Sequence, residues 1–243
     1  MRESIVPIQS LREFRRSITE LGARSPGMPG MGLAFGPTGS GKTTAATMAA
    51  NEFNAVYVRA RAVWTPNAML GDLCRSLGGR VHARAADNFD EVVRLLGLSG
   101  RPLFIDEAEY VMELRDKGLD ILRDLHDVTT VPILLIGMSE RGPLSINRQI
   151  AARSRLAQVR RRIGSWVEFG RLSWEDAQAV AIANCEVGVD DALLKHVLEA
   201  SEGRVGAFTV GLAKIEQFAQ YNGLIRVRRS DWSGELSLGE GDL

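Results

Sequence analysis

The sequence predicts an α/β fold in which a mainly parallel five-stranded sheet, covered by helices, is followed by a small all-helical domain. Strand-like and helix-like segments alternate up to residue 172, and most of the strand-like segments are short, uninterrupted apolar runs. Such runs are typical of parallel strands buried on both faces. A glycine-rich loop joins the first strand to a helix, and only helical periodicity follows residue 172.

The first helix is expected over residues 11–21, where apolar side chains recur at helical spacing and Ser10 with Glu13 can form a capping box. Residues 22–32 contain two prolines and should lead to the first strand. The strands are expected at residues 31–35, 55–58, 102–107, 131–136 and 166–169. The helices between them are expected at residues 43–51, 66–77, 88–96, 111–128 (interrupted near Gly118) and 146–159.

After residue 172, helices are expected at residues 173–184, 190–200 and 205–218, the first with a capping box of Ser173 and Asp176. Four segments result. They are an N-terminal helix and linker (1–30), a nucleotide-binding α/β domain (31–172), a helical lid domain (173–229) and an acidic, flexible tail (230–243).

The composition is that of a globular protein, with 45% hydrophobic and 25% charged residues and a formal net charge of zero. Charge is nevertheless segregated, because residues 141–171 carry eight arginines against Glu168 alone. Two distant cysteines and no long apolar run predict a cytoplasmic protein without disulfides, signal peptide or membrane span.

The most informative motif runs from Gly36 to Thr43 and fits G-x-x-x-x-G-K-[ST], the loop that wraps nucleotide phosphates. Glycines let successive N–H groups face phosphate oxygens, and the helix that follows adds partial positive charge. Lys42 is expected to reach the β- and γ-phosphates, and Thr43 to bind Mg²⁺. The predicted cofactors are ATP and Mg²⁺. The predicted nucleotide contacts in this loop are Gly36, Pro37, Thr38, Gly39, Ser40, Gly41, Lys42, Thr43 and Thr44.

A second motif supplies acids. Asp106 and Glu107 follow the apolar run 103–105, at the carboxyl end of an expected strand. Asp106 is expected to hold the Mg²⁺ shell, and Glu107 to act as general base toward the attacking water. Nucleotide hydrolysis requires these two carboxylates beside a phosphate loop.

Together these motifs and the helical lid resemble the AAA+ ATPases over roughly residues 8–225. Within that superfamily the chain looks like the transposition ATPases of the phage Mu B and TniB type. The stretches that carry this narrower resemblance are residues 36–44, 103–109, 133–138, 160–163 and 202–206.

The resemblance implies further roles. AAA+ proteins place a polar sensor residue where this chain has Met138, which cannot donate a hydrogen bond, so Ser139 is the expected substitute and slow hydrolysis is expected. An arginine finger for the neighbouring subunit fits Arg160 or Arg162, and the two remain alternatives. Arg204 is the candidate for a second sensing arginine.

The resemblance also implies ATP-dependent, sequence-independent binding to duplex DNA, self-association into a ring or filament, and a transposase partner. Arginine contacts to phosphates would drive DNA binding. The candidates are Arg59, Arg61, Arg80 and Arg84, with Arg75 and residues 225–229 as further basic positions. No membrane partner is expected.

Two other functions stay open. One is a helicase loader or secretion-type AAA+ ATPase that uses the same site. The other, from a different class, is a regulatory module that holds ATP as a structural ligand and contacts a protein without DNA. Met138 favours the second, because it weakens the case for hydrolysis.

Overall fold

The computed structural model describes the chain except for residues 3, 115–116, 140–145, 233, 235 and 237–243, and except for the side chain of residue 155. The chain forms two compact units. The sheet unit comprises Glu13–Gly36 and Lys42–Glu168. The helical unit comprises Met1–Arg12, Pro37–Gly41 and Phe169–Leu243.

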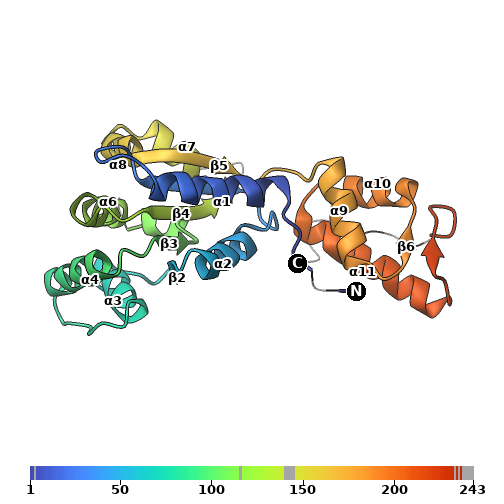
Figure 1. Cartoon of the computed structure of the whole chain (residues 1–243), viewed down its shortest axis with the longest axis horizontal. Coiled ribbons are helices and arrows are strands. Elements are labelled where there is room, and N and C mark those ends of the chain that lie inside the picture. The colour runs from blue at the N-terminus through green and yellow to red at the C-terminus, as the bar shows by residue number, and fades with distance from the viewer. Residues whose placement is uncertain (3, 115–116, 140–145, 233, 235, 237–243) are drawn as a thin grey trace. The chain divides into compact units, whose positions relative to one another are not determined.

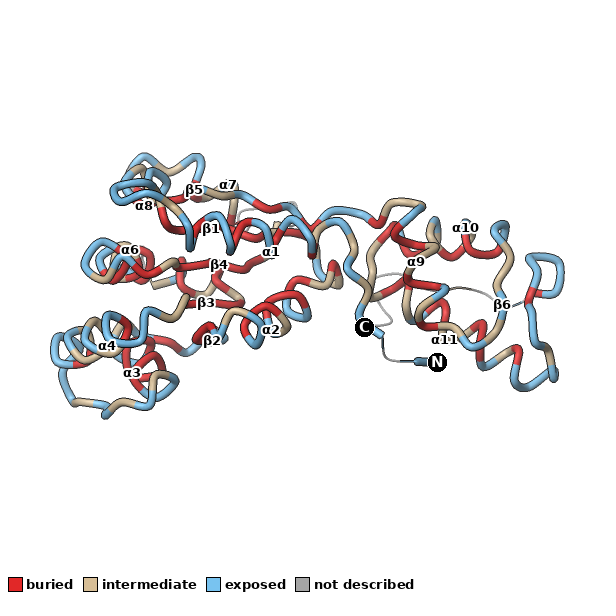
Figure 2. Tube along the Cα trace, in the orientation of Figure 1, coloured by how far each residue is buried: buried red, intermediate tan, exposed pale blue. Residues whose placement is uncertain are grey.

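The sheet unit contains the five-stranded parallel sheet that the sequence predicts (Figure 1). Its strands are β1 (Met31–Gly36), β2 (Val56–Arg59), β3 (Leu103–Asp106), β4 (Ile133–Met138) and β5 (Ile163–Glu168). Their spatial order is β2-β3-β4-β1-β5, and every pair is parallel. Strand β3 is buried throughout and β4 nearly so (Figure 2), which explains their uninterrupted apolar sequences.

Register places the ends of the strands side by side. Gly36 of β1 lies opposite Met138 of β4, and Arg59 of β2 lies opposite Asp106 of β3. The carboxyl ends of four strands therefore meet at one edge of the sheet, which is where open parallel sheets bind their ligands.

The helices of the sheet unit follow the predicted order. They are α2 (Lys42–Glu52), α3 (Pro66–Ser76), α4 (Ala85–Ser99), α5 (Glu109–Met112), α6 (Lys117–Thr129), α7 (Ile146–Ala152) and α8 (Ala157–Arg162), and α1 (Gln9–Gly22) begins within the helical unit. The predicted apolar stripe of α1 is buried, and Phe14 packs against Phe104 of β3 with ring centroids 6.1 Å apart.

Several predicted boundaries are wrong. The Arg12 N–H donates to the Ile8 carbonyl at 3.0 Å, so α1 starts before Ser10 and the predicted capping box does not begin the helix. The single helix predicted over residues 146–159 is two helices joined by a 3₁₀ turn (Ser154–Leu156), because Arg153 has an extended backbone. Strand β5 starts at Ile163, earlier than predicted.

The helical unit contains α9 (Trp174–Asn184), α10 (Asp191–Ala200) and α11 (Val205–Tyr221). It is not purely helical, because β6 (Gly188–Val189) pairs with β7 (Arg226–Val227). Ser173 caps α9 by accepting the Asp176 N–H at 3.0 Å, and the Asp190 carboxylate caps α10. Trp232, in the segment predicted as the tail, is buried and stacks edge-on against Phe218.

Within the described parts of both units, no helix combines the length and apolar character that spanning a membrane would require.

The cap at Asp190 gives a stability prediction. Its carboxylate accepts the N–H groups of Leu193 (2.7 Å) and Arg229 (3.2 Å), so it joins the start of α10 to the segment after β7. Asp190→Ala should lower the free energy of unfolding by about 1 kcal/mol, the usual cost of losing such a cap. Urea denaturation followed by circular dichroism measures this change. Glu199→Ala, at an exposed position on the same helix, is the control, and an equal loss in both variants would contradict the capping role.

Candidate nucleotide site

The phosphate-loop motif adopts the backbone that its glycines predict. Gly39 and Gly41 have φ angles of +75° and +87°, in the left-handed region that glycine enters without strain. Residues Pro37–Gly41 group with the helical unit, where the Gly206 N–H donates to the Gly39 carbonyl at 2.9 Å. A Cβ at position 206 would lie 3.2 Å from that carbonyl oxygen, so the contact favours glycine there.

Lys42 and Thr43 open α2 and lie in the sheet unit. Lys42 is 9% exposed, and its Nζ donates to the Gly36 carbonyl at 2.9 Å. The Thr43 hydroxyl donates to Asp106 Oδ2 at 3.0 Å. The two predicted motifs, about sixty residues apart in sequence, therefore meet directly.

Asp106 ends β3 and is 2% exposed. Its Oδ2 also accepts the Tyr57 hydroxyl at 2.6 Å, and its Oδ1 accepts the Glu107 N–H at 2.9 Å. Burial and the neighbouring carboxylate raise the pKa of Tyr57, so its hydroxyl stays protonated and remains a donor. Sequence reasoning missed Tyr57, because the pairing of β2 with β3 brings it here and no motif marks it.

Glu107 has a φ angle of +55°, an uncommon conformation for a residue with a side chain. The bond from its N–H to Asp106 fixes this turn. Left-handed non-glycine residues cost free energy and gather at functional sites. The conformation turns the backbone immediately after Asp106 and leads into α5.

The donor set fits a magnesium ion. Asp106 and Thr43 present a carboxylate and a hydroxyl next to each other, and both are hard oxygen ligands of the kind that Mg²⁺ takes together with nucleotide phosphates. Of the protein's own groups, these two would hold the ion. Lys42, the predicted phosphate contact, immediately precedes Thr43 in the sequence.

Arg59, a predicted DNA contact, is exposed but paired within the chain. Its guanidinium forms an ion pair with the Glu107 carboxylate, the predicted general base. The register of β2 and β3 explains this pair, because Arg59 lies opposite Asp106. The sequence contained both residues, but no sequence signal revealed that their strands are neighbours.

At the end of β4, the backbone of the predicted sensor position is tied on two sides. The Ser139 N–H donates to the Gly36 carbonyl at 3.0 Å, and the Met138 N–H donates to Glu109 Oε2 at 3.3 Å. Ser139 therefore lies beside the phosphate loop's first glycine. Glu109 is 5% exposed, and sequence reasoning gave it no role.

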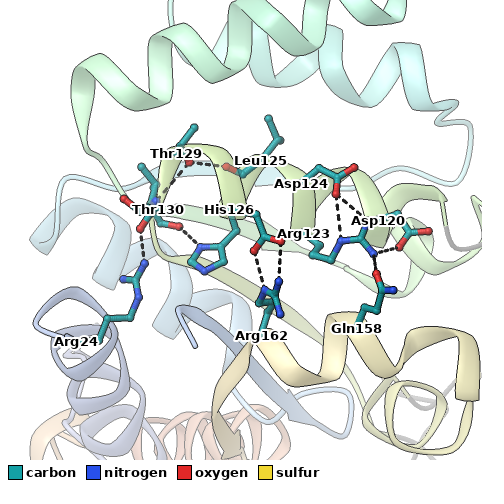
Figure 3. A network of polar contacts seen from close by, with 12 residues as sticks. Arg24, Asp120, Arg123, Asp124, Leu125, His126, Thr129, Thr130, Gln158 and Arg162 are labelled. Carbon is teal, nitrogen blue, oxygen red and sulfur yellow. Dashed lines mark hydrogen bonds and ion pairs between the residues drawn. The ribbon is translucent and has the colours of Figure 1, made fainter. Parts of the chain in front are cut away.

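The two candidate finger arginines lie on α8, immediately before β5. Arg162 forms a two-pronged ion pair with Asp127 of α6, with its Nε 2.7 Å from Oδ1 and its Nη2 3.0 Å from Oδ2 (Figure 3). Arg160 is exposed and donates to the Ala151 carbonyl at 2.6 Å. Both side chains are thus held by contacts within the chain.

Beside Asp127, Figure 3 shows Arg123 bonded to Asp120, Asp124 and Gln158. On the other side of Asp127, the His126 ring meets the Val131 carbonyl, and burial lowers the pKa of His126. The polar side chains of this part of α6 therefore form a hydrogen-bonded network, which Arg162 and Gln158 connect to α8.

Of the predicted DNA contacts, Arg59 and Arg61 line a groove of about 570 Å³ between β2 and α3, with Tyr57 and Arg75. Arg75 pairs with Asp72, which also accepts the Trp64 indole N–H at 2.7 Å. Three arginines therefore share one groove with a single, already satisfied carboxylate among its lining residues.

Arg80 and Arg84 lie elsewhere, exposed on the loop between α3 and α4. Asn88, which is fully buried, holds this loop by accepting the His82 N–H at 2.7 Å and donating to the His82 carbonyl at 3.0 Å. The two arginines are thus on a fixed loop and not on a disordered one.

Arg204 occupies the N-cap position of α11 in the helical unit. Its Nε is buried and has no hydrogen-bond partner among the described residues. Its predicted role as a sensing arginine stays a prediction.

Comparison with known proteins agrees with this description. Residues 27–143 match the family model of an AAA domain. No curated protein matches the chain. Among solved structures, the chain is similar to the Orc1 protein of Aeropyrum pernix in complex with DNA, with 17% identity and a TM-score of 0.58 over 91% of this chain.

At 17% identity this likeness shows the fold, and the chain spans about 62% of the length of that Orc1 chain. The narrower resemblance to the Mu B and TniB type stays a prediction. The two motifs, the parallel sheet and the structural likeness together show the P-loop AAA+ fold, and residues 27–143 are similar to an AAA domain.

Proposed function

We propose that this protein is an ATPase that binds ATP with Mg²⁺, assembles on duplex DNA in the ATP-bound state and is released by slow hydrolysis. The observation that carries the proposal is the contact of Thr43 with Asp106, which brings the last residue of the phosphate-loop motif and the acid motif together within the sheet unit. Few other chemistries need these two motifs together.

The residues of the sheet unit divide the reaction between them. Lys42 would neutralise the β- and γ-phosphates, and Thr43 with Asp106 would hold magnesium, which stabilises negative charge on the phosphates when bound. Glu107 would accept a proton from water as the water oxygen bonds to the γ-phosphorus. The bond from that phosphorus to the bridging oxygen breaks, and ADP leaves with its electrons.

Slow turnover follows from two features. Met138 offers no side-chain donor to the γ-phosphate, and the ion pair with Arg59 engages Glu107. The guanidinium of Arg59 occupies the carboxylate of Glu107, so Glu107 must leave Arg59 before it can accept a hydrogen bond from water.

DNA binding offers a route to that release. The groove lined by Arg59, Arg61 and Arg75 suits the phosphodiester backbone, since arginine forks bind phosphate oxygens with two parallel hydrogen bonds. A phosphate that binds Arg59 would compete with Glu107 for the same guanidinium. DNA would thus both occupy the groove and free the base. The likeness to an Orc1 protein in complex with DNA supports this choice of partner.

Self-association would use α8. A finger arginine must reach the nucleotide of a neighbouring copy, and Arg162 would have to exchange Asp127 for that phosphate. Arg160, whose bond is to a single backbone carbonyl, stays the alternative. The chain has no net positive charge to attract DNA. Several copies side by side would nevertheless bring their few groove arginines together into a continuous DNA-binding surface.

The biological output that we propose is target selection and activation of a transposase, as in the Mu B type. This step rests on the resemblance of residues 36–44, 103–109 and 160–163 to that family. A helicase loader or secretion-type ATPase would use the same site, and stimulation of strand transfer by the purified protein separates these outputs.

The proposal from another class is a regulatory module that holds ATP without hydrolysis. Met138 and the ion pair between Arg59 and Glu107 favour it, because both oppose turnover. Such a module would bind a protein and would show no ATP-dependent affinity for DNA.

Lys42→Ala provides the central test. It should abolish detectable ATP binding and, with it, the ATP-dependent retention of non-specific duplex in a gel shift run with ATP, ADP or no nucleotide. The reason is that the buried ammonium is the only lysine of the phosphate loop. Lys117→Ala, at an exposed lysine on α6, is the control. Unchanged nucleotide affinity in Lys42→Ala would overturn the proposed site, and equal retention in all three nucleotide states would favour the regulatory module.

Arg59→Ala and Glu107→Gln should move hydrolysis in opposite directions. Glu107→Gln removes the proposed base and should slow steady-state phosphate release by at least about 100-fold. Loss of Arg59 should raise the DNA-independent rate by up to about fivefold, since an exposed ion pair contributes at most about 1 kcal/mol. It should also remove stimulation by DNA. Arg61→Ala, which leaves the ion pair intact, should keep the basal rate, and a fall in rate with Arg59→Ala would show that Arg59 assists the base.

Salt dependence tests the groove. Arg61→Ala should weaken binding equally on all duplex sequences and reduce the slope of log affinity against log salt concentration by about 0.9 for the lost phosphate contact. Arg16→Ala, at an exposed arginine of α1, should leave that slope unchanged. Fluorescence anisotropy at several salt concentrations measures both. An unchanged slope for Arg61→Ala, with ATP-dependent DNA binding intact, would place DNA elsewhere.

A further inference from the structure

A buried carboxyl group beside the candidate site has no part in the chemistry described so far. Glu109 is the first residue of α5 and is 5% exposed. Burial raises the pKa of its carboxyl group, nearby Glu107 raises it further, and Lys42 acts in the opposite direction. A polar group buried to this degree costs free energy unless it forms compensating contacts, so its contacts are informative.

The contact that Glu109 makes is with the end of β4. Its Oε2 accepts the Met138 N–H at 3.3 Å. Gly137 makes room for this approach, because a Cβ there would lie 2.8 Å from Glu109 Oε2 and 3.1 Å from Ile146 Cδ1. The carboxyl group therefore lies directly against the strand end where AAA+ ATPases carry their polar sensor.

This contact closes a ring of hydrogen bonds in the sheet unit. Gly36 accepts both Lys42 Nζ and the Ser139 N–H through its carbonyl oxygen. The residue before Ser139 is Met138, whose N–H donates to the carboxyl group of Glu109. Glu109 in turn lies two residues after Glu107 of the acid motif. Asp106 then returns to the phosphate loop through the Thr43 hydroxyl. Glu109 is the side chain in this ring that joins the strand end to the acid motif.

We propose that Glu109 is a positioning residue that links the Met138–Ser139 strand end to the Glu107 turn, and that through this link the protein aligns its general base despite the methionine at the sensor position. The inference rests on the proposed ATPase function. Glu109 touches neither nucleotide nor water in this role. It fixes the spacing between the end of β4 and the start of α5, and Glu107 lies two residues before it.

An alternative explanation is that Glu109 contributes to folding alone. A purely structural role would be filled at lower cost by an apolar side chain, since the surrounding core cluster consists of buried aliphatic residues such as Leu135, Val111 and Ile146. The close fit of the Glu109 carboxyl group against a glycine at position 137 favours a role for the contact itself.

The test compares Glu109→Ala, Glu109→Gln and Gly137→Ala, each assayed with saturating duplex DNA. Glutamine keeps an oxygen that accepts the Met138 N–H, so it should keep kcat within about threefold, whereas alanine should lower kcat by about tenfold or more, within the range expected for a misplaced base. The Kd for a fluorescent ATP analogue and the thermal midpoint without nucleotide should change little in Glu109→Gln. Glu113→Ala, at an exposed glutamate after the same helix, is the control.

Gly137→Ala keeps Glu109 but displaces its carboxyl group, so it should lower kcat while the analogue still binds. The double variant Glu109→Ala with Gly137→Ala should be no slower than the slower single variant, because both remove one contact. A loss confined to Kd, or an equal loss of kcat in Glu109→Gln and Glu109→Ala, would overturn the inference. Equal rates of hydrolysis in wild type and Glu109→Ala would overturn the inference about Glu109 but leave the proposed ATPase function intact. Absence of hydrolysis in the wild type would overturn both.

Discussion

The arrangement of the candidate site depends on one carboxylate. Asp106 accepts hydrogen bonds from Thr43, from Tyr57 and from the N–H of Glu107, and so joins the start of α2, the edge strand β2 and the turn after β3. At 2% exposure this carboxylate would be costly without those partners. Each partner also gains from it. Thr43 is held toward the acid motif, the Tyr57 hydroxyl is satisfied, and Glu107 is kept in its left-handed conformation.

Two arginines that the sequence predicts to contact DNA or a neighbouring subunit form ion pairs within the chain. Arg59 meets Glu107, and Arg162 meets Asp127. Both pairs are partly exposed, so each is weak enough for an incoming phosphate to replace the carboxylate. In the proposed function, the isolated chain would rest with the candidate base and one of the candidate finger arginines engaged in these pairs. Binding of DNA or of a second copy would then release a specific carboxylate or guanidinium, and this would need no large rearrangement of the sheet.

The fold and the main motifs were predictable because they are local in sequence. Uninterrupted apolar runs such as Leu103–Ile105 predict buried parallel strands, and the loop ending in Lys42 and Thr43 carries its chemistry in consecutive residues. Tyr57, Glu109 and the partner of Arg59 were not predictable, because each depends on which strands are neighbours and on their register. The helix start at Gln9 and the break at Arg153 were missed for a related reason, since single backbone hydrogen bonds and dihedral angles decided them.

The edge position of β2 explains why regulation and partner binding could share this strand. A central strand has neighbours on both sides, but β2 pairs only with β3 in the five-stranded sheet, so its other side faces the groove beneath α3. Side chains alternate along a strand, and Tyr57 and Arg59 therefore lie on one face, two residues apart. That face meets Asp106 and Glu107. A ligand in the groove would thus contact the same two side chains that hold the acid motif, which is the shortest path by which DNA could alter the reactivity of Glu107.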